Sequence, residues 1–486
     1  MKNLMKPVAG ILALLATASA FAQTGNPYIH DPSSIVECDG KYYTFGTGGG
    51  GLISEDGWTW NSGAVRPYGG AAPDAIKIGD RYLVIYGTTG GGTGGGHASK
   101  IMTMWNKTLD PNSPDFEYSE PIMVYESLID EDFNAIDPGV LLDPTTGRLW
   151  LTTGTYFGYI RQVEVDPKTG ARVEGTEAID VGRNMEASTM MYNDGWYYLL
   201  GTHGTCCDGV NSTYNIVVGR SRNPRGPFID NVGRSMFEGG GKAVITTEGR
   251  LVGPGHFGRY IEEEGVEFLS FHWEADMDQS GRSVLGVRNL LWKDGWPVAA
   301  EAFKPGTYEI MSERSGYGLE IAVDFVRAEG GMRGMSRTAT DVPKVSIEAQ
   351  KLSDVIGTWP EGIIPIRESF YMARPHQRWS IIPVPEAGGT LAGPYYKIVI
   401  EGTNRALAAT ADAEVESVPE FTGAPEQLWR IDQLTDGKFR IMPKEVPGHS
   451  EPLALVSFGN SSATLATFDF SSDNFKWDFK GFSPIK

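Results

Sequence analysis

The sequence predicts an all-β protein in which a five-bladed β-propeller is followed by a β-trefoil-like domain. The chain of 486 residues contains 62 glycines and 20 tyrosines, a composition typical of turn-rich β proteins. No long stretch shows a sustained helical period. Two different repeats divide the chain, one over roughly the first 300 residues and the other over the remainder. These observations together exclude a mainly helical fold.

The first 22 residues have the pattern of a secretory signal peptide. Lys2 and Lys6 precede the short apolar run VAGILALLATASA, and the small residues at 20 and 22 form a typical cleavage site before Gln23. The apolar run is too short to span a membrane, and no later run is longer. We therefore expect an exported protein, periplasmic or extracellular, that does not insert into a membrane.

The chain is strongly acidic, with a formal net charge of −19 and a pI of about 4.9. Such a surface repels nucleic acid and anionic lipid, so a neutral partner such as a polysaccharide fits better. We expect no nucleic-acid partner and a monomeric protein.

Only three cysteines occur, at positions 38, 206 and 207. Three cysteines do not make a disulfide framework, and the odd count leaves at least one thiol free. The adjacent pair Cys206-Cys207 is either bonded or two small residues that pack under a loop. It lacks the usual spacing of zinc ligands, so no zinc site is predicted.

A repeated unit runs through roughly the first 300 residues. Each copy has a polar residue, a short apolar strand, a turn and an aromatic strand. The polar residues are Asp31, Asp74, Asp137, Glu186 and, in a looser copy, His256. Five such units fit a radial propeller whose innermost strands line a central channel. Because each polar residue opens an innermost strand, we expect four carboxylates and a histidine to converge at one mouth of this channel.

Converging carboxylates indicate cleavage of glycosidic bonds. One carboxyl group protonates the leaving oxygen and another activates a water molecule. A third, placed nearby, raises the pKa of the acid through its like charge. A single Asp-Pro is most often a turn, so repetition at one offset from the following turn is what favours a functional site.

Residues 26 to about 300 resemble glycoside hydrolase family 43, and its arabinanases in particular. The matching segments are IHDPS, FNAIDPGVLLD, MEAS, THGTCCDGVNSTYNIVVGRS and GPGHF. The resemblance implies that Asp31 is the general base, that Glu186 is the general acid and that Asp137 tunes and orients the acid. It also implies inversion at the anomeric carbon. A calcium ion in the channel is implied as well, held mainly by water with His256 contributing.

The resemblance also implies a set of substrate-binding residues, namely His30, Asp74, Tyr156, Phe157 and Ser212. Tyr156 and Phe157 stand where the arabinanases carry a Phe-Trp pair, and their rings can stack on a sugar face. The sequence departs from the family pattern at Ala71-Ala72, which precede Pro73-Asp74 where a tryptophan is usual. The segment MEAS likewise replaces the commoner Glu-Ala-Pro.

A second repeat begins near residue 300. Trp379, Trp429 and Trp477 recur at intervals of 50 and 48 residues, each after a stretch of short strands. A threefold period of this length indicates a β-trefoil. Gln377 and Gln427 resemble the Gln-x-Trp signature of ricin-type lectin domains. Sugar binding by this domain and a purely structural role both remain open.

The predicted organisation is a signal peptide over 1–22, a catalytic propeller over 23–302 and a trefoil over 303–486. The leading hypothesis is an exported inverting hydrolase that cleaves α-1,5-linked L-arabinan, a plant cell-wall polysaccharide, in an endo fashion. An exo-acting α-L-arabinofuranosidase or β-xylosidase is the near alternative, because the same propeller serves both. A non-catalytic glycan-binding propeller is the alternative of another class. The presence of Asp31 and Glu186 favours the hydrolase.

Overall fold

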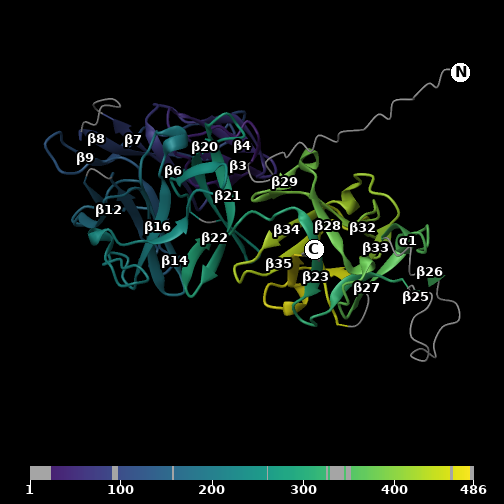
Figure 1. The fold of residues 1–486 in the computed structure, drawn as a ribbon. Helices are drawn as coiled ribbons and strands as arrows, with labels where there is room; N and C mark the ends of the chain where they lie inside the picture. The colour runs from purple at the N-terminus through teal and green to yellow at the C-terminus, as the bar shows by residue number, and fades with distance from the viewer. Residues whose placement is uncertain are drawn as a thin grey trace, which may run out of the picture.

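The computed structural model describes residues 23–89, 97–155, 158–259, 261–323, 327–328, 344–345, 352–459 and 463–481. The predicted signal peptide lies outside these ranges. Figure 1 shows two β-rich parts, the first coloured purple to teal and the second green to yellow. Within the described residues the fold is all-β apart from short 3-10 turns and one five-residue helix, α1 (Leu352–Ile356). None of the described helices has the length and apolarity needed to cross a membrane.

Five antiparallel sheets form the blades of a propeller, each built from strands that follow one another in the chain. The first blade contains β2 (Val36–Cys38), β3 (Lys41–Phe45), β4 (Gly50–Ser54) and β5 (Thr59–Val65), with β1 (Thr24–Gly25) added parallel to β5. The second contains β6 (Ala71–Ile78), β7 (Arg81–Thr89), β8 (Ser99–Asn106) and β9 (Ile122–Ser127). The third contains β10 (Gly139–Leu142), β11 (Leu149–Thr153), β12 (Tyr159–Val165) and β13 (Ile179–Arg183).

The fourth and fifth blades complete the ring. The fourth contains β14 (Glu186–Asn193), β15 (Trp196–His203), β16 (Asn215–Ser221) and β17 (Lys242–Ile245), with 3-10 turns η2 (Gly209–Asn211) and η3 (Met236–Glu238). The fifth contains β18 (Leu251–Gly255), β20 (Val266–Asp276), β21 (Arg282–Lys293) and β22 (Trp296–Ala299), with β19 (Ile261–Glu263) paired to β20. The N-terminal segment closes the ring, because the amide of Leu285 donates to the carbonyl of Pro27.

A residue in the left-handed conformation lies in or beside the innermost strand of each blade, before β2 and β10, within β6 and β14, and directly after β18. The angle φ is 50° at Asp31, 44° at Ala72, 52° at Asp137, 49° at Ala187 and 58° at His256. Residues other than glycine adopt this conformation rarely, so its recurrence marks the same kink in all five blades.

This alignment corrects the predicted ring at two positions. In the second blade Ala72, and not Asp74, occupies the place of Asp31. In the fourth blade the equivalent residue is Ala187, and Glu186 precedes it by one position. The ladders of both blades shift register at these points, which changes where the following side chains lie.

Asp74 lies deeper in the channel, at the centre of a buried network between blades. Its Oδ1 accepts hydrogen bonds from the amides of Ser34 at 3.1 Å and Ala75 at 2.8 Å. Its Oδ2 accepts from the amide of Val140 at 3.0 Å and pairs with the guanidinium of Arg259. Both oxygens are thus held by the first, second, third and fifth blades. The geometry gives Asp74 a structural role in place of the predicted substrate contact.

The C-terminal part is a β-trefoil-like domain in which a closed barrel is capped by three hairpins. The barrel strands pair in a ring in the order β23 (Gly306–Ser312), β28 (Trp379–Pro383), β31 (Tyr396–Ile400), β34 (Trp429–Gln433), β35 (Phe439–Pro443) and β38 (Trp477–Gly481). The hairpins are β24 (Gly318–Ile321) with β27 (Ile364–Ser369), β32 (Ala406–Ala409) with β33 (Val415–Val418), and β36 (Ala454–Val456) with β37 (Thr464–Ala466).

Short elements complete this domain. They are β25 (Arg327–Ala328), β26 (Lys344–Val345), β29 (Gly389–Thr390), β30 (Gly393–Pro394) and the 3-10 turns η5 (Pro375–Gln377), η6 (Pro385–Ala387), η7 (Pro425–Gln427) and η8 (Asp473–Phe475). The turns η5, η7 and η8 each end two residues before one of the repeated tryptophans.

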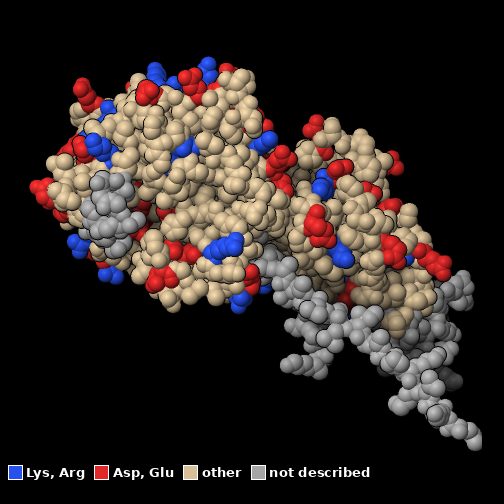
Figure 2. Space-filling view, turned by 90° about the horizontal axis from the view of Figure 1, so that it is seen from above, with Lys and Arg blue, Asp and Glu red and all other residues tan. Residues whose placement is uncertain are grey.

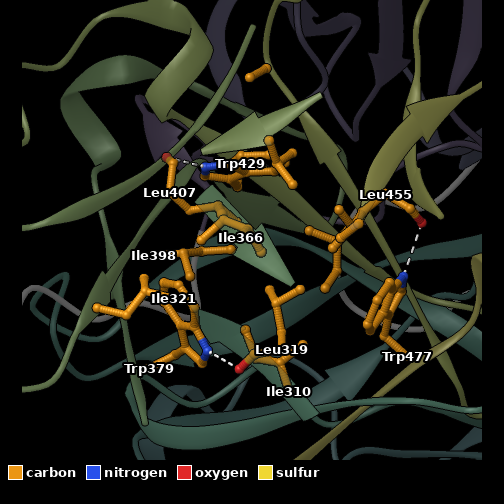
Figure 3. Close-up of a cluster of buried hydrophobic side chains, with 14 of the residues drawn as sticks. Ile310, Leu319, Ile321, Ile366, Trp379, Ile398, Leu407, Trp429, Leu455 and Trp477 are labelled. Atoms are coloured by element: carbon orange, nitrogen blue, oxygen red, sulfur yellow. Dashed lines mark hydrogen bonds between the residues drawn. The ribbon is translucent and has the colours of Figure 1, made fainter. Parts of the chain in front are cut away.

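The three tryptophans hold equivalent places in the trefoil core (Figure 3). Each is fully buried and begins the last barrel strand of its lobe. Each indole donates its N–H to a leucine carbonyl at 2.8–3.0 Å, Trp379 to Leu319, Trp429 to Leu407 and Trp477 to Leu455. The threefold tryptophan period therefore reflects the construction of this core.

The trefoil packs directly on the propeller. Arg430 forms a two-pronged ion pair with Glu263, at 3.2 and 2.9 Å, and the amide of Trp292 donates to the carbonyl of Thr435 at 3.0 Å. The last blade strand ends at 299 and the first barrel strand begins at 306, on either side of the predicted boundary. Figure 2 shows acidic side chains spread over both parts on the face that it presents.

Candidate active site

Asp31 lies in a cradle of hydrogen-bond donors. Its Oδ2 is 2.9 Å from Nδ1 of His30 and accepts from the Thr47 hydroxyl at 2.7 Å, and its Oδ1 is 3.6 Å from Nδ1 of His256. Burial alone would raise the pKa of Asp31, but the contacts with His256 and His30 outweigh it and hold the pKa well below its usual range. Asp31 is therefore an ionised carboxylate, as a general base requires.

Glu186 has the opposite electrostatic character. It is the first residue of β14, is only 7% exposed, and its Oε1 accepts a hydrogen bond from the hydroxyl of Tyr214. Burial raises the pKa of Glu186, and the negative charge of Asp31 adds to this effect while the Tyr214 hydroxyl opposes it. The protonated form is thus favoured, as a general acid requires.

Asp137 touches the strand that carries the acid. Its Oδ2 accepts a hydrogen bond from the amide of Ala187 at 3.2 Å. Burial and the negative charge of Glu186 raise the pKa of Asp137. The three predicted catalytic carboxyl groups are thus close enough to influence one another, and two of them are pushed towards the protonated form.

The other predicted site residues are placed less uniformly. His30 contacts the base directly, as described above. Ser212 donates to the carbonyl of Thr205 at 2.7 Å and accepts from the amide of Tyr214 at 3.2 Å, so its hydroxyl shapes the loop after β15. Tyr156 and Phe157 lie outside the described residues.

Two residues that contact the predicted site residues were not identified from the sequence. Tyr214, in the longest matching segment, contacts the acid, and Glu274 lies behind the base, with its Oε1 3.1 Å from Nε2 of His30. A signal for Glu274 was present in SFHWEAD. Alternation along a strand places His272 and Glu274 on one face and Trp273 on the other.

A small cavity lies behind the ring, with room for about one water molecule. Residues from all five blades line it, among them Pro32, Pro73, Pro138, Ser188 and His256. The hydroxyls of Ser188 and Thr189 are buried here with no hydrogen-bond partner among the described residues. These unpaired oxygens fit one water molecule, and a largely hydrated cation needs more room than this cavity has.

A closed protein cage for a metal is a poorer fit. Among the described residues, two groups of three side chains are close enough to share an ion, His30–Cys206–Cys207 and His30–Asp31–His272. Neither group contains His256. The first has its sulfurs joined in a disulfide, and the second already has its nitrogens and oxygens engaged in hydrogen bonds.

Comparison with known proteins agrees with this geometry. Residues 44–297 match the model of the glycosyl hydrolases family 43. The chain belongs to this family. It is therefore a glycoside hydrolase, and the matched span covers most of the propeller.

Relatives of this family 43 hydrolase include two curated bacterial proteins. The extracellular exo-α-(1→5)-L-arabinofuranosidase ArbA of Cellvibrio japonicus is 30% identical over 307 residues, 56% of this chain and 86% of the relative. The extracellular endo-α-(1→5)-L-arabinanase 1 of Bacillus subtilis is 30% identical over 307 residues, 57% of this chain and 90% of the relative.

Solved structures give the same assignment for the propeller. An exo-1,5-α-L-arabinanase from a bovine ruminal metagenomic library shares 30% identity with a TM-score of 0.52, covering 57% of this chain and 97% of that protein. The α-L-arabinanase of Cellvibrio cellulosa, complexed with arabinohexaose, shares 26% identity with a TM-score of 0.52, covering 56% of this chain and 95% of that protein.

Replacement of Tyr214 by phenylalanine should move the alkaline limb of the kcat/KM profile to higher pH. The Tyr214 hydroxyl stabilises the ionised form of Glu186, so its loss raises the pKa of the acid and keeps it protonated at higher pH. A hydrogen bond to a charged group is worth about 1.5–3 kcal/mol, which corresponds to a shift of about 1–2 pH units. Initial rates between pH 5 and 10 measure this shift.

A matched control is Tyr198→Phe, because Tyr198 lies in the same blade as Tyr214 and its hydroxyl donates at 2.7 Å to the carbonyl of Gly295 in the fifth blade, away from the carboxyl groups. Its profile should equal that of the wild type. An alkaline limb that stays in place or moves down in Tyr214→Phe would contradict the assignment of Glu186 as the acid.

Proposed function

We propose that this family 43 hydrolase cleaves α-1,5-linked L-arabinan with inversion at the anomeric carbon. The observation that carries the proposal is the contrast between two neighbouring carboxyl groups, Asp31 held by two histidines and a threonine hydroxyl and Glu186 buried against Tyr214. The histidines lower the pKa of Asp31, whereas burial raises the pKa of Glu186. Asp31 takes a proton from the attacking water, whose oxygen forms a bond to the anomeric carbon. Glu186 gives its proton to the glycosidic oxygen as the bond to that oxygen breaks. Asp137 accepts a hydrogen bond from the amide of Ala187, the residue after the acid, and so orients the strand that carries Glu186.

The substrate class rests on the relatives and on charge. The relatives described above are named for exo or endo action on α-1,5-linked arabinan. A neutral polymer suits a chain with a net charge of −19. The family assignment and the intact carboxyl ring both argue against the alternative of a non-catalytic glycan-binding propeller.

Endo action is the first choice and exo action is the second candidate. The product profile on linear α-1,5-arabinan separates them. A ladder of short oligosaccharides supports endo cleavage, whereas arabinose or one small oligosaccharide from the first minutes supports exo cleavage. Release of xylose from xylo-oligosaccharides, with none from arabinan, would overturn the proposed substrate in favour of the β-xylosidase alternative.

Export of the protein is part of the proposal. The segment 1–22 has the charge, apolar run and cleavage site of a signal peptide, and two relatives are named extracellular. Cleavage before Gln23 would leave the first described strand intact. N-terminal sequencing of the secreted protein tests this point.

A calcium ion in the wider channel, outside the small cavity, is also proposed, with His256 as its protein ligand and water completing the shell. When bound, the ion would supply positive charge behind the carboxyl ring. Removal of metal by a chelator should lower both kcat and the melting temperature, and added calcium should restore both. A free calcium concentration one hundred times its Kd raises the free energy of unfolding by about 2.7 kcal/mol.

The variant His256→Gln provides the control for the metal, because its melting temperature should no longer respond to calcium. Full activity and an unchanged melting temperature in metal-stripped wild-type protein would contradict the proposed calcium site.

A further inference from the structure

Glu274 is a buried acceptor of three hydrogen bonds directly behind the base. Its side chain is 2% exposed, and its Oε1 lies 3.1 Å from Nε2 of both His30 and His272. Its Oε2 accepts from the amide of Cys207 at 3.1 Å. Burial would raise the pKa of Glu274, but the hydrogen bonds from the two histidines lower it to about 2. The carboxylate is therefore ionised and fully engaged.

The two histidines reach Asp31 from different sides. The amide of Asp31 donates to Nδ1 of His272 at 3.0 Å, so the ring proton of His272 sits on Nε2, which faces Glu274. His30 has a carboxylate at each nitrogen, Asp31 at Nδ1 and Glu274 at Nε2, which suits the doubly protonated ring. The two rings stack with centroids 4.5 Å apart. Glu274 thus selects the tautomer of one histidine and supports the charge of the other.

The third contact of Glu274 comes from an unusual loop. Cys206 and Cys207 are joined by a disulfide, and a potential ligand atom of His30 lies within 4.8 Å of their sulfurs. A bond between adjacent residues closes a small covalent ring that restricts the backbone of this loop. Cys207 has a left-handed φ of 59°, and its amide points at the carboxylate. The sequence left open whether these residues were buried thiols. In the structure Cys206 is half-buried, Cys207 is exposed, and the two are joined by a disulfide.

We propose that Glu274 is a positioning residue for the general base and that the Cys206–Cys207 ring holds it in place. This inference rests on the proposed function of Asp31 and extends it. Glu274 acts through His272 on the backbone of Asp31 and through His30 on its carboxylate. The disulfide restricts the Cys207 amide, which donates to Glu274. The Cys206–Cys207 bond is therefore linked through Glu274 and the histidines to the carboxylate of Asp31.

The first test is Glu274→Gln, which keeps the shape of the side chain and removes its charge. We expect kcat on arabinan to fall at least tenfold with KM within about twofold, because the wrong tautomer of a histidine partner lowers kcat in other hydrolases, by up to about 10⁴-fold. Glu267→Gln is the matched control, since Glu267 lies on the same strand and accepts from the indole of Trp292 at 2.6 Å. Its kinetics should equal those of the wild type.

A double-mutant cycle separates positioning from general support of the fold. If Glu274 acts through the base, Glu274→Gln should add little to the loss already caused by Asp31→Asn. A loss of the same factor in both backgrounds means that Glu274 acts independently of the base, and it would overturn the proposal. Activity is read on an aryl arabinofuranoside, because the absorbance of the released phenol allows the slow variants to be followed over long incubations.

The second test addresses the disulfide. A dithiol reduces it by donating two electrons, which leaves two protein thiols and a cyclic oxidised reagent. The only other cysteine is Cys38, which is a free and buried thiol, so an effect of reduction reports on this one bond. Reduction should lower kcat of the wild type and have a much smaller effect on Glu274→Gln. An unchanged kcat after complete reduction, measured by thiol titration, contradicts the role of the ring.

Histidine-selective nitrogen NMR reads the same network without a substrate. The wild type should show His272 protonated at Nε2 alone and His30 protonated at both nitrogens at neutral pH. Glu274→Gln should change both sets of ring signals, and unchanged signals would overturn the inference even if the protein acts on a glycan other than arabinan. Conversely, altered signals in a protein without arabinan hydrolysis would uphold the inference and reject the proposed substrate.

Discussion

Glu186→Gln should lower kcat on linear arabinan by about 10²–10⁴-fold, the range by which a general acid accelerates a reaction. Glutamine keeps the size of the side chain but has no proton to give to the leaving sugar. An aryl arabinofuranoside with an acidic phenol needs little protonation, so the same variant should retain most of its activity on that substrate. Initial rates on the two substrates measure this contrast.

The melting temperature of Glu186→Gln should stay close to that of the wild type, because the buried hydroxyl of Tyr214 can still donate to the amide oxygen. An equal loss on both substrates would mean that Glu186 does not act as the acid. Unchanged activity on arabinan would remove it from catalysis altogether.

Asp31→Asn should lower kcat by a similar factor, about 10²–10⁴-fold, but on both substrates. Attack by water requires a base whatever the leaving group, and the amide cannot accept the proton. The hydrogen bond from Thr47 and the contact with His30 limit any change of position. Initial rates with the arabinan and aryl substrates therefore distinguish the base from the acid.

A restored rate of Asp31→Asn on the activated substrate would contradict this assignment and would point to an acid role instead. The two variants together make a crossed test. Only Glu186→Gln should be rescued by a good leaving group, and only Asp31→Asn should fail on every substrate.

The propeller and the trefoil were both predictable because each is built from a sequence pattern that recurs several times along the chain. A short apolar strand, a turn and an aromatic strand recur through the propeller, and the three tryptophans recur because each indole must donate to an equivalent carbonyl. The sequence also showed that Asp31 belongs to the first copy of the propeller repeat and Glu186 to the fourth.

The register of the second blade was not predictable in the same way. The kink at Ala72 carries no glycine, so nothing in the sequence marks its left-handed conformation. Asp74 looked equivalent to Asp31, yet two residues further along the strand it meets Arg259, which comes from the fifth blade. Such a partner is separated by 185 residues and is brought near only when the ring closes.

Glu274 illustrates the same limit. It is 244 residues from His30 in the chain, and the pattern SFHWEAD alone does not distinguish a core strand from a strand that faces the site. The disulfide between Cys206 and Cys207 was one of two open alternatives, and only the structure relates it to the base.

The most direct test of the account is time-resolved proton NMR of linear α-1,5-arabino-oligosaccharides mixed with the mature protein. We predict that new reducing ends appear first as the β-anomer and then equilibrate with the α-anomer, since one water attacks opposite the leaving group. First appearance of the α-anomer would require a covalent intermediate and would contradict the roles of Asp31 and Glu186. An absence of any product would contradict arabinan as the substrate.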